Sequence, residues 1–177
     1  MPRQDRATFS FAPLEDGDII TVGQATLTAL ATPGHTLESI SYLLDRQGLF
    51  TGDTLFLNAV GRPDLEASAV ESRTRAQFLY RSLKRLVALP GNPLILPGHT
   101  SQPVPFNGAA IAAPLAEVLG GLQSLTLTED AFVEFLLSRI PPTPPNHAAI
   151  VELNESGELP EGDLTELEAG ANRCAIA

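Results

Sequence analysis

The stretch Thr32-Pro33-Gly34-His35-Thr36 ends a segment in which polar and apolar residues alternate, and its last four letters occur again at residues 97–100. In both copies a glycine and then a histidine stand where an apolar strand is expected to end. Gly52-Asp53 has the same design, directly after another apolar run. Glycine allows a sharp backbone turn there and leaves room beside the side chain that follows. The pattern therefore singles out three polar side chains at strand ends: His35, Asp53 and His99.

The segments around these motifs predict a mixed α/β chain. Period-two alternation bounded by turn residues favours strands, whereas apolar residues three or four apart favour helices. Ala76, Leu79, Leu83 and Leu86, for example, share one face of a helix expected over 71–87. In chain order we expect a hairpin at 19–31, strands at 39–44, 49–51 and 94–96, and helices at 71–87, at 112–123, after Thr128 and near the C-terminus.

The expected topology brings the three polar side chains toward one edge of a sheet. The chain leaves His35 along one strand, turns at 45–48 and returns along the next, so Asp53 lies at the same edge as His35. His99 joins them if the strand at 94–96 belongs to the same sheet and runs in the appropriate direction. Two imidazoles and a carboxylate suit a transition metal, either non-haem iron or a hydrolytic zinc ion. The alternative is that all three are polar residues at loop entrances.

Composition narrows the classes of partner. The chain has 177 residues with 44% apolar and 18% charged residues, enough apolar material for a packed core. A net charge of −10 repels phosphate backbones and argues against nucleic acid. A single cysteine, Cys174, allows no internal disulfide, and no apolar stretch is long enough to suggest a signal peptide or a membrane span. We therefore expect a cytoplasmic protein with no membrane partner.

Four segments in order make the sequence similar to a known family: TPGHT at 32–36, FTGDTLF at 50–56, GRPD at 61–64 and LPGH at 96–99. They resemble successive motifs of the metallo-β-lactamase superfamily. The first two are shared with glyoxalase II, whereas GRPD and the ending Ala171-Asn172-Arg173-Cys174 look more like persulfide dioxygenases and their rhodanese-fused relatives. The resemblance implies an αββα sandwich, with residues 1–177 as a single domain that forms its C-terminal part and carries an acidic tail at 151–177.

The resemblance also implies a chemistry. His35 and Asp53 match two of the three iron ligands of a persulfide dioxygenase, and His99 matches the histidine that completes the second metal position of two-metal hydrolases. Such dioxygenases use oxygen to oxidise glutathione persulfide to sulfite and glutathione. Iron(II) is the expected cofactor, zinc is the alternative, and the expected substrate is a small thiol or persulfide of the glutathione type.

One family motif is absent from this sequence. The superfamily's first metal motif, His-x-His-x-Asp-His, lies ahead of TPGHT, but the chain has three histidines and none precedes His35. The strands that carry that motif are absent too. A fragment, a late-assigned start codon and a degenerate relative all fit this observation. Without those strands a sheet edge and part of a core face are exposed, which predicts pairing with a second copy or with a missing segment.

Two further residues have open roles. Arg62 forms either a structural pair with Asp64 or a bidentate contact to a substrate carboxylate. Cys174 either meets a sulfur substrate, as the family match suggests, or is a small buried residue. Three functions are compatible with the sequence: a persulfide dioxygenase-like iron protein, a zinc thioester hydrolase of the glyoxalase II type, and a non-catalytic interaction module.

Overall fold

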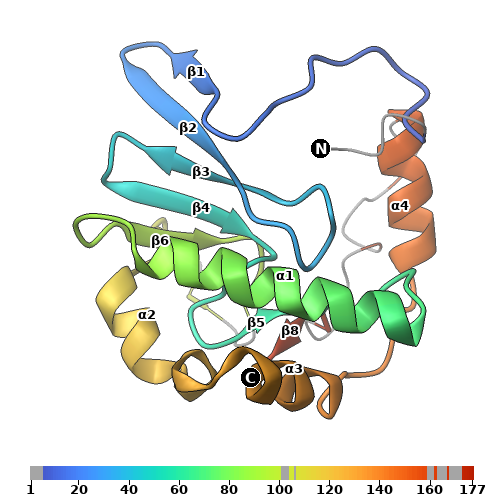
Figure 1. Cartoon of the computed structure of the whole chain (residues 1–177). Helices are drawn as coiled ribbons and strands as arrows, with labels where there is room; N and C mark the ends of the chain where they lie inside the picture. The colour runs from blue at the N-terminus through green and yellow to red at the C-terminus, as the bar shows by residue number, and fades with distance from the viewer. Residues whose placement is uncertain (1–5, 101–103, 106, 159–161, 163–166, 168–172) are drawn as a thin grey trace.

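The computed structural model describes residues 6–100, 104, 105, 107–158, 162, 167 and 173–177. Its elements, labelled in Figure 1, are β1 (Ile19–Val22), β2 (Ala25–Ala31), β3 (Ile40–Leu44), β4 (Gly48–Gly52), β5 (Val60–Gly61), α1 (Ala69–Val87), β6 (Leu94–Pro97), β7 (Ala113–Pro114), α2 (Leu115–Gly121), a 3₁₀ turn (Gln123–Thr126), α3 (Glu129–Leu137), α4 (His147–Ser156) and β8 (Ala175–Ile176).

The predicted elements are present, with one shifted helix boundary, and the structure adds two short strands, β5 and β8, that the sequence did not predict. The helix expected over 112–123 begins only at Leu115, and the residues before it form the short strand β7. The reason is Pro114, because a proline disfavours the helical conformation of the residue before it. Ala113 is therefore extended and pairs with Ile95 of β6. Twelve residues of the acidic tail at 151–177 lie outside the described residues.

A six-stranded sheet in the order β1-β2-β3-β4-β6-β7 forms the centre of the structure. Neighbours from β1 to β4 are antiparallel, whereas β4 and β6 are parallel, with Leu49 opposite Ile95. Parallel neighbours need a crossover connection, and here the crossover contains α1. The condition on which the placement of His99 depended is therefore met: β6 joins the same sheet and ends at the same edge as β4.

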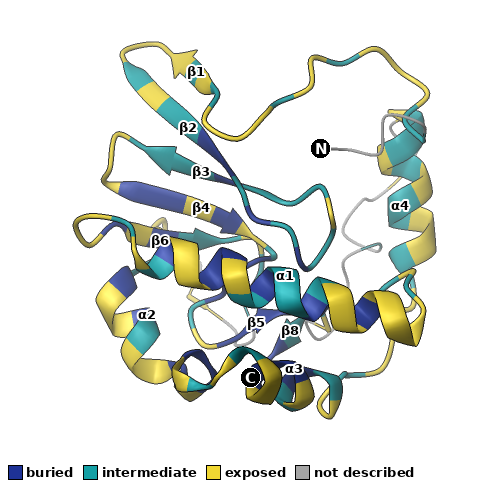
Figure 2. Ribbon diagram, in the orientation of Figure 1, coloured by how far each residue is buried: buried dark blue, intermediate teal, exposed yellow. Residues whose placement is uncertain are grey.

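The core lies between one face of this sheet and the helices. Period-two alternation points Leu49 and Ile95 to this face, and both are fully buried. Helix α1 crosses the sheet in Figure 1, and buried and exposed segments alternate along it in Figure 2. The helical core residues are Ala76, Leu79, Leu83 and Leu86 of α1, Leu115 and Val118 of α2, and Phe132, Val133 and Leu136 of α3.

The opposite face of the sheet is apolar but partly open. Strand register places Ala29, Tyr42, Phe50 and Leu96 in one row across four strands. The next row holds Leu27, Leu44, Gly48 and Leu94. Phe50 is 39% exposed and Leu94 is 46% exposed, although each alternates with a fully buried neighbour. Ala29 and Gly48 in the same rows are buried, so the exposure is limited to part of this face. We call these two rows the open face.

Local sequence signals set where the main helices begin. Ser68 and Glu71 form a reciprocal capping box at the start of α1. Lys84 and Arg85 in its last turn place positive charge at the negative end of the helix dipole, which stabilises the helix. Thr128 caps α3, as predicted, by accepting a hydrogen bond from the Ala131 N–H. No helix in the described part of the chain combines the length and the apolar character needed to cross a membrane.

Helix α1 packs directly on the TPGHT turn. The hydroxyl of Ser82 donates to the Pro33 carbonyl at 2.8 Å. Gly34 has a φ of +150°, and a Cβ built there would overlap the Cα and Cβ of Leu79. The glycine before His35 is therefore required for two reasons, backbone conformation and close contact with the helix.

This contact predicts that Gly34→Ala destabilises the protein strongly. We expect a loss of about 2–4 kcal/mol in the free energy of unfolding, because the new methyl group meets main-chain atoms that cannot move aside. Gly23→Ala is the matched control: it also has a positive φ, +63°, but open space around its Cβ, so it should lose only about 1 kcal/mol. Denaturant titration measures both, and equal losses would contradict the packing argument.

Candidate metal centre

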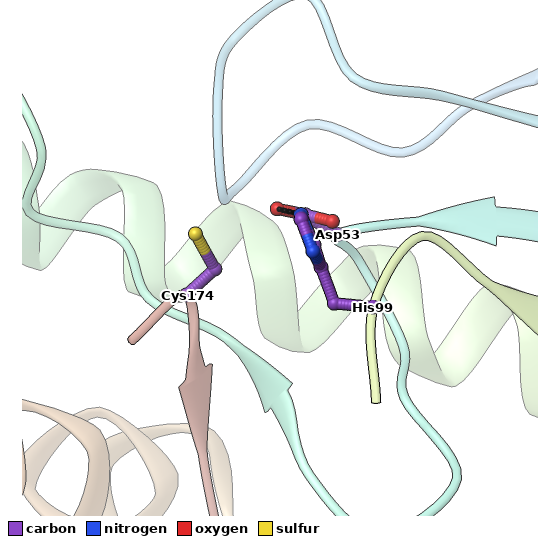
Figure 3. Close-up of side chains that lie close together, drawn as sticks. All are labelled: Asp53, His99 and Cys174. Carbon is purple, nitrogen blue, oxygen red and sulfur yellow. Dashed lines mark ion pairs between the residues drawn. The ribbon is translucent and has the colours of Figure 1, made fainter. Parts of the chain in front are cut away.

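Two histidines that follow β2 and β6 approach a carboxylate that follows β4. Asp53 follows β4, and its Oδ2 lies 3.6 Å from Nε2 of His35 and 3.3 Å from Nε2 of His99. The side chains of His35, Asp53 and His99 are 13%, 18% and 32% exposed, so they are shielded but still accessible to a ligand. Figure 3 shows Asp53 and His99 side by side at the ends of their strands. The juxtaposition predicted from topology is thus observed.

The orientation of the His35 ring is set by a backbone group. Its Nδ1 lies 2.8 Å from the carbonyl oxygen of Arg62. A carbonyl only accepts hydrogen bonds, so Nδ1 carries a proton, and in the neutral form of the ring the lone pair lies on Nε2, which faces Asp53. Two acceptors that face each other repel unless a proton or a cation lies between them. Metal-binding histidines typically donate the N–H of their other ring nitrogen to a carbonyl or carboxylate in this way.

The environment of Asp53 keeps it ionised. Burial raises the pKa of its carboxyl, but a hydrogen bond from His99, the charges of His35 and His99 and a hydrogen bond from Cys174 together hold that pKa below its ordinary value. A carboxyl group must be deprotonated to bind a metal. The surroundings of Asp53 therefore favour the form that a metal ion needs.

Cys174 reaches the centre from the other end of the chain. Strand β8 pairs with β5, and the Arg62 N–H donates to the Cys174 carbonyl at 2.9 Å. The sulfur of Cys174 and single donor atoms of Asp53 and His99 all lie within 4.8 Å of one another. In Figure 3 the thiol faces the Asp53–His99 pair across a gap. Of the motif at 171–174, Ala171 and Asn172 lie outside the described residues.

Arg62 occupies a structural position. Its side chain is fully buried and forms a bidentate pair with Asp64 at 2.8 and 2.7 Å. The same guanidinium donates to the carbonyls of Pro142 and Arg173, both at 3.0 Å. These four bonds favour the structural role over contact with a substrate carboxylate, since no edge of the group faces the cleft.

Two glycines make room for the cluster. A Cβ at Gly98 would lie 2.6 Å from Oδ1 of Asp53, and a Cβ at Gly61 would lie 3.0 Å from the Cβ of His35 and overlap the Asp53 carbonyl. Glycine at both positions therefore lets the strand ends approach closely. Sequence reasoning explained Gly98 as part of its motif but missed this role of Gly61, although GRPD contains it.

The donor set fits a transition-metal ion. Two ligands at about 2.1 Å from one tetrahedral ion are about 3.4 Å apart, and the separations in this structure are 3.3 and 3.6 Å. Imidazole nitrogen, carboxylate oxygen and thiolate sulfur all bind such ions. His147, the third histidine of the chain, lies outside the cluster, with its Nδ1 3.1 Å from the Pro144 carbonyl.

Comparison with known proteins agrees with this geometry. The sequence profile of the Metallo-beta-lactamase superfamily matches residues 2–99, more than half of the chain. The chain belongs to the metallo-β-lactamase superfamily. The α/β fold of this superfamily member matches that of solved relatives, which confirms the fold class inferred from the sequence motifs.

Relatives with two different names are similar to this metallo-β-lactamase-fold chain. It is 39% identical over 88 residues to the mitochondrial persulfide dioxygenase ETHE1 of Bos taurus, covering 49% of the chain and 32% of that protein. It is 40% identical over 87 residues to the hydroxyacylglutathione hydrolase of Brucella anthropi, covering 49% and 30%. The crystal structure of ETHE1 from Myxococcus xanthus superposes with a TM-score of 0.71 and 31% identity, over 87% of this chain and 64% of that one.

These similarities establish a relationship to enzymes, but they cover only part of each relative. The alignments span about a third of the length of the two curated proteins. The two sequence identities are almost equal, so they do not separate the two activities. The residues of the centre therefore have to decide between them.

The buried position of Arg62 predicts a large effect of its substitution. Arg62→Gln leaves Asp64 unpaired, so we expect a loss of about 3–5 kcal/mol in the free energy of unfolding. Arg73→Gln removes an exposed pair with Glu134 and should lose less than about 1 kcal/mol. Chemical denaturation compares the two variants. An Arg62→Gln protein as stable as Arg73→Gln would refute the structural role.

Proposed function

We propose that this chain is a mononuclear metalloprotein of the persulfide dioxygenase type, or a part of one, with His35, Asp53 and His99 as metal ligands. The observation that carries the proposal is the approach of both histidines to one ionised carboxylate, with a thiol beside them. Two histidines and a carboxylate are the ligand set typical of non-haem iron oxygenases, so iron(II) is the proposed ion.

Cys174 favours the dioxygenase over a hydrolase. A thiol next to the donor cluster is suited to contact with a sulfur-containing substrate, and a hydrolytic zinc site needs no such group. The GRPD segment and the Arg173-Cys174 pair support the same assignment. Arg62 of that segment donates hydrogen bonds to the carbonyls of both Arg173 and Cys174. The 87% coverage of this chain by the Myxococcus xanthus ETHE1 structure adds to it.

The proposed reaction converts glutathione persulfide, oxygen and water into glutathione and sulfurous acid, which loses its protons to give sulfite. The terminal sulfur is oxidised from the sulfane to the sulfite level and oxygen is reduced. The S–S bond breaks, and the inner sulfur takes up a proton to become the glutathione thiol. The iron ion, when bound, supplies the redox chemistry. The Arg62 carbonyl orients the His35 ring, the surroundings of Asp53 hold that carboxyl ionised, and the Cys174 thiol lies beside the ligand set.

A thioester hydrolase is the second candidate. The 40% identity to the hydroxyacylglutathione hydrolase supports it, and so does His99, which resembles the histidine of a second metal position. Zinc would then replace iron, and the product would be a free thiol. Both candidates act on a sulfur derivative of glutathione, and the chain's single cysteine, which allows no internal disulfide, fits a reducing compartment such as the cytoplasm.

The metal content of the purified chain is the first test. We expect stoichiometric iron, and we expect His35→Ala or Asp53→Ala to weaken binding by more than the ~10–100-fold typical of outer-sphere substitutions. His147→Ala is the matched control, because His147 is close to the centre but outside the cluster. Elemental analysis and metal titration measure the effect. A chain that binds no metal would leave the non-catalytic module as the remaining interpretation.

Activity separates the two enzymes. The dioxygenase consumes oxygen when it is given glutathione persulfide and releases no thiol from S-lactoylglutathione, whereas the hydrolase does the reverse. An oxygen electrode and a thiol-reactive dye read the two outcomes in parallel on the metal-loaded chain. Thiol release without oxygen consumption would reject the dioxygenase proposal.

We further propose that a second copy of the chain covers the open face. Phe50 and Leu94 are exposed within two apolar rows, and two such faces can pack against each other about a two-fold axis. No charged side chain stands in either row, so packing two copies together buries no unpaired charge.

The dimer predicts that Phe50→Lys shifts the chain to a monomer. A lysine in the middle of the contact would have to be buried without a partner. Val70→Lys is the matched control, because Val70 is 76% exposed but lies on α1. Sedimentation velocity at several protein concentrations reports the change, and a wild-type chain that is monomeric throughout would overturn the proposal.

A further inference from the structure

The metal centre opens into a cleft of about 650 Å³. His35, Asp53, His99 and Cys174 all line it, so the cleft is continuous with the donor cluster. Three arginines, Arg6, Arg75 and Arg173, also line it and come from three separate parts of the chain. The lining of the cleft therefore combines these guanidinium groups with the carboxylates of Glu38, Asp53 and Glu66.

The three arginines differ in their partners. Arg6 is neutralised twice, by Glu66 at 3.0 Å and by Glu155 at 2.6 Å. Arg75 donates to the carbonyl of Leu65 at 2.9 Å, and Arg173 donates to the carbonyl of Thr143 at 3.4 Å. Within the described part of the chain, neither Arg75 nor Arg173 has a carboxylate partner.

Helix α1 provides an internal comparison. Its arginines outside the cleft each pair with an acid: Arg73 with Glu134, Arg81 with Glu129 and Arg85 with Asp16. Arg75, which lies on the cleft side of the same helix, has only a carbonyl. In a chain with a net charge of −10, acidic partners are abundant. Arg75 and Arg173 nevertheless have no acidic partner in the described part of the chain, and both line the cleft. An anionic ligand in the cleft could therefore pair with them.

Both groups are held in place. The hydrogen bond to Leu65 fixes the Arg75 guanidinium and leaves its other N–H groups available. The backbone of Arg173 is anchored by Arg62, and Arg173 directly precedes Cys174. A guanidinium binds a carboxylate through two parallel hydrogen bonds, and prior fixing lowers the entropy lost on binding.

We propose that Arg75 and Arg173 form a carboxylate-binding subsite that selects thiol ligands carrying carboxylates over thiols that lack them. The ligand class rests on the proposed function, since glutathione has two carboxylates, one at each end of the molecule. The subsite holds these carboxylates while the sulfur points toward Asp53, His99 and Cys174. It contributes to ligand binding and takes no part in the chemical step.

Direct binding tests the subsite without any reaction. The probes are S-methylglutathione, which has two carboxylates and no reactive thiol, and its diethyl ester, which has none. Calorimetry on the wild-type chain should detect the diacid and find the diester at least about tenfold weaker. Arg75→Gln and Arg173→Gln should each weaken the diacid about tenfold and leave the diester unchanged.

Two further variants control for charge and folding. Arg73→Gln removes a positive charge from the same helix outside the cleft and should bind the diacid as the wild type does. Arg75→Lys keeps the charge but loses the planar fork, so its affinity should lie between those of wild type and Arg75→Gln. Equal wild-type affinity for diacid and diester, unchanged affinity in both glutamine variants, or no binding of either probe would overturn the subsite.

The outcome is separate from that of the dioxygenase proposal. Carboxylate-dependent binding without oxygen consumption keeps the subsite and rejects the dioxygenase. Oxygen consumption with an unchanged KM for glutathione persulfide in both glutamine variants keeps the dioxygenase and rejects the subsite.

Discussion

The parallel pairing of β4 with β6 is the constraint on which the rest of the structure depends. Parallel neighbours must be joined by a crossover, so α1 has to lie across the sheet, and its close packing on Gly34 then fixes the turn that carries His35. The same pairing makes β4 and β6 end at one edge. Asp53 and His99 follow those ends directly, and this is why two residues far apart in the sequence come within 3.3 Å of each other. One topological feature thus sets the positions of the core helix and of the donors.

Arg62 couples the ends of the chain to this edge. Its carbonyl orients His35, its N–H binds the Cys174 carbonyl and its guanidinium binds the Arg173 carbonyl. A buried cation is unfavourable unless it is paired, and the bidentate contact with Asp64 supplies that partner. The pair with Asp64 offsets the cost of burying the Arg62 cation. Through its other hydrogen bonds, Arg62 also fixes the positions of His35 and Cys174 relative to each other. Loss of the arginine would disturb both donors together, although the residue itself touches no ligand.

The centre was more predictable from sequence than its surroundings. At each strand end a glycine is followed directly by a polar side chain, and this pattern is local. His35, Asp53 and His99 could therefore be singled out as candidate site residues before their positions were known. Arg62 could not be assigned, because its partners Pro142 and Arg173 lie 80 and 111 residues away. In the sequence, Arg75 cannot be told apart from the other cations of a solvated helix, because only the structure shows that it lines the cleft. β5 and β8 have only two residues each, too few to show a period of two.

The open face and the metal centre are two consequences of one set of strands. Phe50 lies three residues before Asp53, and Leu96 lies three residues before His99, so the exposed rows lead to the strand ends that carry the donors. Any polypeptide that covers the open face must therefore end close to the centre. Such a partner would shield the donors from water, strengthen their electrostatic interactions and bring its own side chains within reach of the ion. Under the two proposals, a partner on the open face and a metal ion at the strand ends would therefore occupy neighbouring positions.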